Sequence, residues 1–318
     1  MESLCSVKLL FPSFSELRYN SYKKKQSMFK EKNVVIQLDT KTVYSFMDSL
    51  IPIKKYVQKA KDLGYSHLGM MDVDNLYGAY HFLEEAESAG LQPLLGLELS
   101  LIKAEQELHL RLLALDSQGY RNLMKVSTLK MMGQKNWEDF QHLFKGLAVI
   151  VPAFDGVADL DLGLDFYVGV FPATPKQEFG RPTLPLHTVR YFDRGDLETL
   201  QMLRAIRENA SLREIGSLPN HEFLLAPDAL AGAFKETFPE SLANLEKLVR
   251  DVHYDINREL KLPRFNRERP AVEELRERSE AGLKKRGLTG KLYQERLDQE
   301  LGVIHQMGFD DYFLIVWD

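Results

Sequence analysis

The pattern of apolar residues between Val34 and about Asn209 restricts the fold more than any other feature, because it changes repeatedly between two periods. Short apolar runs of strand length alternate with stretches in which apolar residues recur at helical spacing. An all-α or all-β fold would keep one of these periods, whereas βα units need both. The pattern therefore predicts an α/β fold built on a parallel sheet or barrel.

The first predicted helix has the clearest boundaries. Pro52 suits its first turn, apolar residues from Ile53 onward fall on one face, and Gly64 is a natural stop. The remaining elements are predicted in this order: a strand at 67–71, a helix capped by Asp74 or Asn75 that ends at Gly90, strands at 94–100 and 108–115, a helix at 117–132, strands at 147–151, 166–171 and 184–189, and helices at 196–208 and after Pro239.

The two ends of the chain differ from this middle part. Residues 1–33 fit no element and contain seven basic and three acidic residues, so we expect a basic leader, either a disordered extension or a mis-assigned start ahead of Met28. After a loop at 262–270, residues 271–286 and 291–307 predict helices, and the apolar run 312–317 predicts a buried strand. We therefore expect three parts, residues 1–33, 34–265 and 266–318.

Composition excludes several classes of function. The net charge is −5, and the basic leader leaves the rest of the chain near −9, which argues against a general nucleic-acid binder. Cys5 is the only cysteine, so an intrachain disulfide and a cysteine-rich zinc site are excluded. The chain has no Walker, G-x-S-x-G, H-E-x-x-H or C-x-x-C motif. It has neither a signal peptide nor an apolar stretch of membrane-spanning length, which predicts a cytoplasmic protein with no membrane partner.

Polar residues at the predicted strand ends are the candidates for chemistry, since the loops after barrel strands carry the active sites of such folds. These candidates are Asp39, Lys41, Asp48, Asp72, Glu98, His109, Thr188 and Arg190. Four carboxylates and one histidine could hold a divalent cation. The alternative for each carboxylate is an ordinary helix cap or surface charge.

Several blocks of sequence carry a resemblance to a known family. The runs DTKTVYSFMDS (39–49), MDVDNLYGAYHF (71–82), QPLLGLELS (92–100), LLALDSQGYRNLMKV (112–126) and MGFDDYFLIVWD (307–318) closely resemble consecutive blocks of the alpha subunit of bacterial DNA polymerase III. The similarity covers about Val34 to Asp318 and is greatest with the shorter form found in low-GC Gram-positive bacteria such as streptococci. It implies a polymerase-and-histidinol-phosphatase (PHP) domain with a distorted (β/α)7 barrel, followed by the start of an α+β palm whose catalytic aspartates lie beyond Asp318.

The resemblance also implies that the metal site of this domain is degenerate. In metal-binding members the first block holds H-x-H, where this sequence has Asp39 and Lys41, and the late D-x-H pair is Thr188 and Arg190. Asp48, Asp72, Glu98 and His109 match the family pattern, but fixed positive charges oppose cation binding. We expect Lys41, helped by Arg190, to pair with Asp39, Asp72 and Glu98 in place of metal ions. The alternative is that Lys41 points into solvent.

These observations lead to one reading and two alternatives. The first is an amino-terminal part of a replicative polymerase, with no catalytic residue of its own and a PHP domain that serves as a structural or interaction module. Its partners would be the rest of the alpha subunit and, in the intact protein, DNA and replisome proteins such as the sliding clamp. No cofactor is expected in this part, and Mg would serve the intact polymerase. The alternatives are a metal-dependent phosphoesterase or 3′–5′ exonuclease that uses Mn or Zn, and a stand-alone non-enzymatic binding module.

Overall fold

The computed structural model describes residues 36–254, 256 and 263–318, and the predicted leader at 1–33 lies outside these residues. The chain divides into two compact units, Met1–Asp255 and Ile256–Asp318. This division lies ahead of the boundary that the sequence predicts after residue 265.

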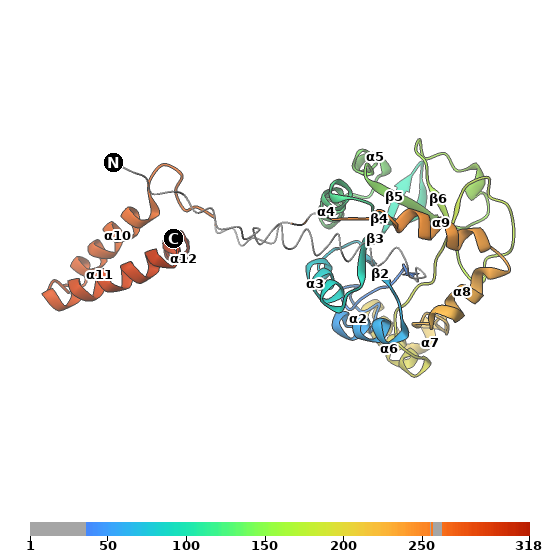
Figure 1. Ribbon diagram of the computed structural model, residues 1–318, viewed down its shortest axis with the longest axis horizontal. Coiled ribbons are helices and arrows are strands. Elements are labelled where there is room, and N and C mark those ends of the chain that lie inside the picture. The colour runs from blue at the N-terminus through green and yellow to red at the C-terminus, as the bar shows by residue number, and fades with distance from the viewer. Residues whose placement is uncertain (1–35, 255, 257–262) are drawn as a thin grey trace, which may run out of the picture. The chain divides into compact units, whose positions relative to one another are not determined.

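Seven strands of the first unit form one curled sheet in which sequence order equals spatial order (Figure 1). The edges of the sheet meet at one point, because Thr40 after the first strand and Val189 after the last form a parallel bridge. The predicted α/β barrel-like class is therefore confirmed. The strands are β1 (Ile36–Gln37), β2 (His67–Val73), β3 (Gln92–Lys103), β4 (Gln106–Ala114), β5 (Leu147–Pro152), β6 (Tyr167–Val170) and β7 (Thr183–Pro185).

The sheet is mixed, which the pattern of a parallel sheet or barrel did not predict. β4 runs antiparallel to both β3 and β5, whereas the other neighbouring strands are parallel. Lys103 pairs with Gln106, so only Ala104 and Glu105 connect β3 to β4, both with left-handed φ values of 47° and 68°. A connection this short can join only antiparallel strands.

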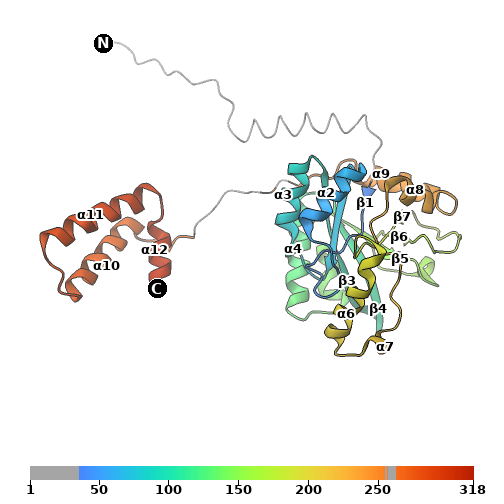
Figure 2. The same ribbon diagram turned by 90° about the horizontal axis from the view of Figure 1, so that it is seen from below.

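Most helices of the first unit lie where the sequence predicts them. In Figure 2, α2, α3 and α4 are neighbours along the sheet. The start of α3 is a correction: it begins at Ala79, because Asn75 does not cap the helix but accepts a hydrogen bond from the Tyr77 amide at 3.1 Å. The helices are α2 (Ile53–Leu63), α3 (Ala79–Ala89), α4 (Ser117–Met131), α5 (Trp137–Phe140), α6 (Leu197–Glu208), α7 (Leu212–Ile215), α8 (Pro227–Lys235) and α9 (Pro239–Val249).

One buried apolar cluster of the first unit lies between α9 and one face of the sheet. Leu245 and Val249 of α9 pack against Leu94, Leu113 and other strand residues, all of them buried. Glu98 and Arg111 occupy the same face as these strand residues, since side chains two apart on a strand share a face. The apolar core is thus continuous with a charged region further along β3 and β4.

The described residues of the second unit form three helices, α10 (Ala271–Lys285), α11 (Lys291–Gln306) and α12 (Asp310–Trp317). The prediction of a strand at 312–317 is wrong. Leu314 is fully buried against Leu275 and Leu301, and Asp310 and Asp311 supply the acidic first turn that favours a helix. A short apolar run does not by itself distinguish a buried strand from a helix. In the described parts of the chain, no helix is both long and apolar enough to cross a membrane.

Candidate functional site: buried ion pairs at the barrel mouth

Lys41 lies at the centre of the charged region and is completely buried. Its ammonium is 2.5 Å from Asp39 Oδ1 and 2.8 Å from Glu98 Oε2. The backbone holds this position, because the Lys41 amide donates to the Val189 carbonyl at 2.9 Å, beside the bridge that joins the sheet edges. The prediction that Lys41 pairs with Asp39 and Glu98 is confirmed, and the alternative of a solvent-facing lysine is wrong.

Arg111 on β4 is a second cation that sequence reasoning missed. Its Nε lies 3.2 Å from Asp39 Oδ2, and its Nη2 lies 3.0 Å from Glu98 Oε2. Glu98 and Arg111 are direct cross-strand partners in the β3–β4 ladder. Each carboxylate therefore contacts both Lys41 and Arg111, and Thr188 adds a hydroxyl that donates to Asp39 Oδ2 at 2.7 Å.

Asp72 at the end of β2 is held by neutral donors rather than by an ion pair with Lys41. Its Oδ1 accepts from the Thr42 amide at 2.5 Å and from the Ser45 hydroxyl at 2.7 Å, and its Oδ2 accepts from the Thr42 hydroxyl at 2.7 Å. No direct pair between Asp72 and Lys41 is present among the described residues, so this part of the predicted pairing is wrong.

Arg190 belongs to a separate ion cluster around Asp48. It pairs with Asp48 Oδ2 through Nη1 and with Glu222 Oε2 through Nε at 3.2 Å. Arg204 and Arg207 approach Asp48 Oδ1 at 2.9 and 3.2 Å. The prediction that Arg190 helps Lys41 is wrong for direct contacts, since its partners are Asp48 and Glu222.

His109 lies away from both clusters. It is exposed, and its Nδ1 is 2.8 Å from the Ser100 hydroxyl, its cross-strand neighbour. The strand therefore brings Arg111 to Glu98 and places His109 further out along the same face. Of the eight candidate residues, Asp39, Lys41, Glu98 and Thr188 form one connected network, to which Arg111 is added.

The pKa values of the three carboxylates are shifted in opposite directions. Burial alone would raise the pKa of Asp39 and Glu98, but Arg111 and Lys41 outweigh it and hold both pKa values below the usual range. Burial raises the pKa of Asp72, although Thr42 and Ser45 donate to it. The network therefore keeps Asp39 and Glu98 ionised, whereas Asp72 lacks a contacting cation.

The residues of the mouth do not fit a metal ion. Among the described residues, no three His, Cys, Asp or Glu side chains come together in a way that could hold one. The space between Asp39 and Glu98 is taken by the Lys41 ammonium, which is itself a cation, donates to Asp39 and forms an ion pair with Glu98. What this arrangement can do chemically is neutralise buried carboxylates without a cofactor.

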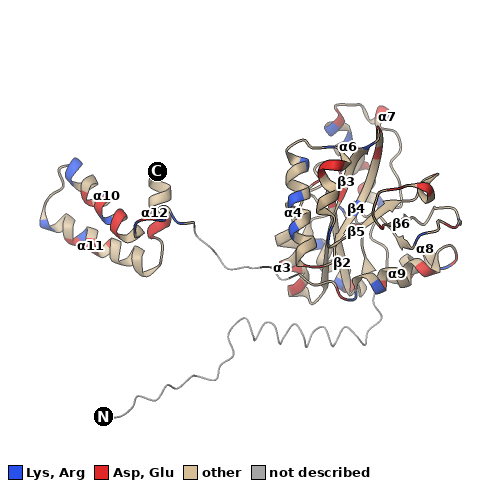
Figure 3. Cartoon of the chain, turned by 90° about the horizontal axis from the view of Figure 1, so that it is seen from above, with Lys and Arg blue, Asp and Glu red and all other residues tan. Residues whose placement is uncertain are grey.

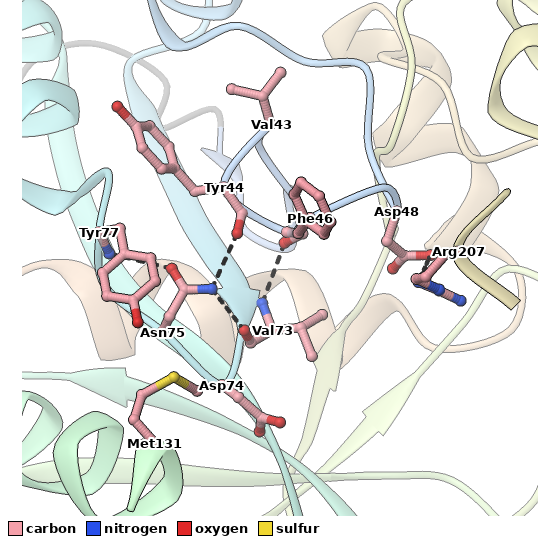
Figure 4. Close-up of a pocket in the computed structure, with 11 residues that line it drawn as sticks. Val43, Tyr44, Phe46, Asp48, Val73, Asp74, Asn75, Tyr77, Met131 and Arg207 are labelled. Carbon is pink, nitrogen blue, oxygen red and sulfur yellow. Dashed lines mark hydrogen bonds and ion pairs between the residues drawn. The ribbon is translucent and has the colours of Figure 1, made fainter. Parts of the chain in front are cut away.

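A groove opens beside these clusters and has a volume of about 500 Å³. It lies between the loop after β1 and the loop after β2 (Figure 4), with Phe46, Tyr77 and Met131 along it and Asp48 and Arg207 at one end. We call it the loop groove, lined by Val43, Tyr44, Ser45, Phe46, Asp48, Val73, Asp74, Asn75, Tyr77, Met131 and Arg207.

Two family models match the chain, one in each unit. The model described as a PHP domain matches residues 37–174, which include Asp39, Lys41, Glu98 and Arg111. The model described as the bacterial DNA polymerase III alpha NTPase domain matches residues 273–318. The first match contains most of the charged network, and the second contains all of α11 and α12.

Similar proteins are also alpha subunits of bacterial DNA polymerase III. A DNA polymerase III subunit alpha of Streptococcus pyogenes is 47% identical over 284 residues, which are 89% of this chain and 27% of that relative. The subunit of Bacillus subtilis is 27% identical over 325 residues, 89% of this chain and 29% of the relative. The chain thus spans little more than a quarter of the length of these curated relatives.

Solved structures show a weaker likeness. An amidohydrolase from Chromobacterium violaceum matches with a TM-score of 0.33 and 11% identity, over 56% of this chain and 84% of that one. A likeness of this size carries no argument about the site.

Proposed function

Because this chain carries a PHP domain and matches the amino-terminal region of bacterial DNA polymerase III alpha subunits, we propose that it serves chromosomal DNA synthesis as a structural module of that cytoplasmic polymerase. In this proposal the PHP domain does not hydrolyse phosphoesters. Its barrel mouth is stabilised by protein cations where catalytic members of the family hold metal ions. The DNA and the sliding clamp would be bound by the intact subunit.

The observation that carries the proposal is the position of Lys41 and Arg111 between Asp39 and Glu98. A metal-dependent phosphoesterase needs carboxylates that are free to bind a cation and an open coordination position for water or substrate. Here each of the two carboxylates already contacts two side-chain cations. The rival function, a phosphoesterase or 3′–5′ exonuclease, would have to displace both of them.

Metal titration tests this proposal most directly. After dialysis against a chelator, we expect no heat of binding for Mn or Zn by calorimetry, and no hydrolysis of p-nitrophenyl phosphate or of a labelled single-stranded oligonucleotide. An Asp72→Asn variant is the control for contaminating hydrolases, since it changes the remaining carboxylate that lacks a contacting cation. Tight metal binding, or metal-dependent hydrolysis that Asp72→Asn abolishes, would favour the enzyme instead.

The structural role has its own test in the intact subunit. Lys41→Met should shorten the thermal half-life of primer extension, because it breaks the buried network, and leave the initial rate at low temperature unchanged. Lys54→Met is the matched control, since Lys54 is exposed on α2. An initial rate that falls without any loss of thermal stability would contradict a purely structural role.

A further inference from the structure

The loop groove is preformed by side-chain hydrogen bonds between its two walls. Asn75 donates from Nδ2 to the Tyr44 carbonyl at 3.0 Å and to the Val73 carbonyl at 2.8 Å. The Ser45 hydroxyl accepts from the Val73 amide at 3.1 Å. These bonds tie the loop after β1 to the end of β2, as the dashed lines of Figure 4 show. A site whose walls are already fixed loses little conformational entropy when a ligand enters.

Four large apolar side chains along the groove are exposed to solvent. Phe46 is 73% exposed, Tyr77 66%, Met131 52% and Val43 45%. Isolated exposed apolar residues are ordinary, but a cluster of aromatic and Met side chains beside a concave surface is typical of binding sites for protein partners. None of these four is needed for the core, since the described core clusters do not include them.

A basic helix face leads to this groove. Exposed residues of α4 follow each other at helical spacing as Arg121, Met124, Lys125, Thr128 and Met131, the last of which lines the groove. α4 contains Arg121, Lys125 and Lys130 and no acidic residue (Figure 3). Arg121 and Lys125 have no ion pair with any described residue. A basic helix face of this kind is unexpected in a chain whose net charge is −5.

The charges at the opposite end of the groove are paired with one another. Asp48, the carboxylate at that end, contacts Arg190, Arg204 and Arg207, and Glu222 and Glu208 pair in turn with Arg190 and Arg207. Asp74, the other acidic residue of the lining, has the Lys130 ammonium 3.8 Å from its Oδ1. An incoming ligand therefore meets apolar side chains in the middle, paired charges at this end and, at the α4 end, Arg121 and Lys125, which have no ion pair among the described residues.

We propose that the loop groove and the exposed face of α4 form a docking site for an acidic peptide segment of a partner protein, whose apolar side chains enter between Phe46, Tyr77 and Met131. Carboxylates at one end of the segment face Arg121 and Lys125 of α4. This is the arrangement by which amphipathic segments bind apolar grooves, with anchors that supply affinity and charges that fix orientation.

A peptide fits these observations better than a nucleic acid. The groove wall is partly aliphatic, with Val43, Val73 and Met131. Single-stranded nucleic acids are normally held by aromatic platforms within a continuous basic track. Here the basic residues flank an apolar centre instead.

The test is a selection from a library of random short peptides displayed on phage, with the whole chain immobilised. We expect the enriched peptides to combine Asp or Glu with aromatic or large aliphatic residues. The most enriched peptide, labelled with a fluorophore, is then titrated by anisotropy at low and high salt. Binding should weaken at high salt, because the flanking ion pairs are exposed.

Three variants locate the site. Phe46→Ser removes an anchor contact and should weaken binding roughly five- to tenfold, as truncation of an interface residue worth about 1 kcal/mol does. The double variant Arg121→Glu, Lys125→Glu should weaken it by a similar factor and abolish most of the salt dependence. Leu292→Ser is the matched control, because Leu292 is 76% exposed in the second unit, and it should bind as the wild type does.

Four outcomes would overturn the proposal. No peptide is enriched over the blank surface, or the enriched peptides have no excess of acidic residues, or they bind Phe46→Ser as tightly as the wild type. The fourth is that another ligand occupies the groove: an oligothymidylate that Phe46→Ser fails to bind would make it a nucleic-acid site. Self-association that Phe46→Ser abolishes would likewise make it an interface between copies of this chain.

Discussion

Replacing Lys41 with Met tests the ion-pair network directly. The substitution removes the ammonium that lies 2.5 Å from Asp39 and 2.8 Å from Glu98, and it keeps a long side chain in the fully buried space. Two carboxylates then share Arg111 as their only contacting side-chain cation among the described residues.

The size of the effect follows from the remaining contacts. Removing one partner of a buried ion pair costs about 3–5 kcal/mol, because the other charge stays buried without compensation. Arg111 and the Thr188 hydroxyl still contact Asp39, so the lower end, about 3 kcal/mol, is expected. For a domain of this size that corresponds to a fall in melting temperature of about 6–12 °C.

Urea unfolding followed by tryptophan fluorescence measures this loss. Trp137 is 2% exposed in the first unit, and Trp317 lies in the second. A Trp317→Phe background therefore makes the signal report the first unit alone. Lys54→Met serves as the control for replacing an exposed lysine, and it should change the free energy of unfolding by less than about 0.5 kcal/mol.

The pH dependence separates charge from packing. Asp39 and Glu98 have pKa values below their usual range in the folded protein, so their contribution is fully present above the unfolded pKa of about 4. It is lost as pH falls through the folded values. The gap between wild type and Lys41→Met should thus be widest near neutral pH and shrink in acid.

Two results would refute this reasoning. Equal free energies of unfolding at neutral pH would show that Lys41 contributes nothing net. A gap that stays constant into acid would show that Lys41 acts through packing rather than charge. The double variant Lys41→Met, Glu98→Gln should recover part of the loss, since it leaves one carboxylate for Arg111.

Three further predictions follow from the fold. Asp72→Asn should cost less than Asp39→Asn in urea unfolding at neutral pH, because burial already raises the pKa of Asp72 whereas Asp39 neutralises two buried cations; the reverse order would contradict the assignment of charges. Val316→Lys should leave the melting temperature unchanged, because Val316 is 67% exposed on α12; a lower melting temperature would show that this face is packed. Primer extension by the purified chain should be blank, and activity that copurifies through two affinity steps would contradict this.

The sequence was sufficient to predict the parts of the fold that depend on local pattern. α2 begins directly after Pro52 and ends at Gly64, which has a φ of 88°, as its sequence signals indicate. The resemblance to the polymerase alpha subunits, with Lys41 at a position where metal-binding members hold a ligand, was enough to expect an ion pair at the barrel mouth. These features need no knowledge of distant contacts.

The features that the sequence did not predict depend on strand register and on tertiary packing. Arg111 was missed because it reaches Glu98 only through the β3–β4 pairing, and the Ala104–Glu105 turn has neither Asn nor Gly to mark it. The apolar run at 312–317 has strand-like composition, yet burial of Leu314 against two helices makes it helical. The sequence was enough to place Asp48 among the polar candidates. It did not predict the contacts of Asp48 with three arginines, because these come from two distant segments.

The two-residue turn between β3 and β4 gives the charged network an unusual sensitivity to chain length. Inserting a single residue beside Ala104 would slip β4 by one position, and every side chain beyond the turn would change to the opposite face of the sheet. Leu110 or Leu112 would then face Glu98, and the Arg111 guanidinium would be forced into the apolar layer beneath the helices. Point substitutions in the turn should be tolerated, whereas insertions or deletions of one residue should abolish folding, so the length of this connection is under stronger constraint than its composition.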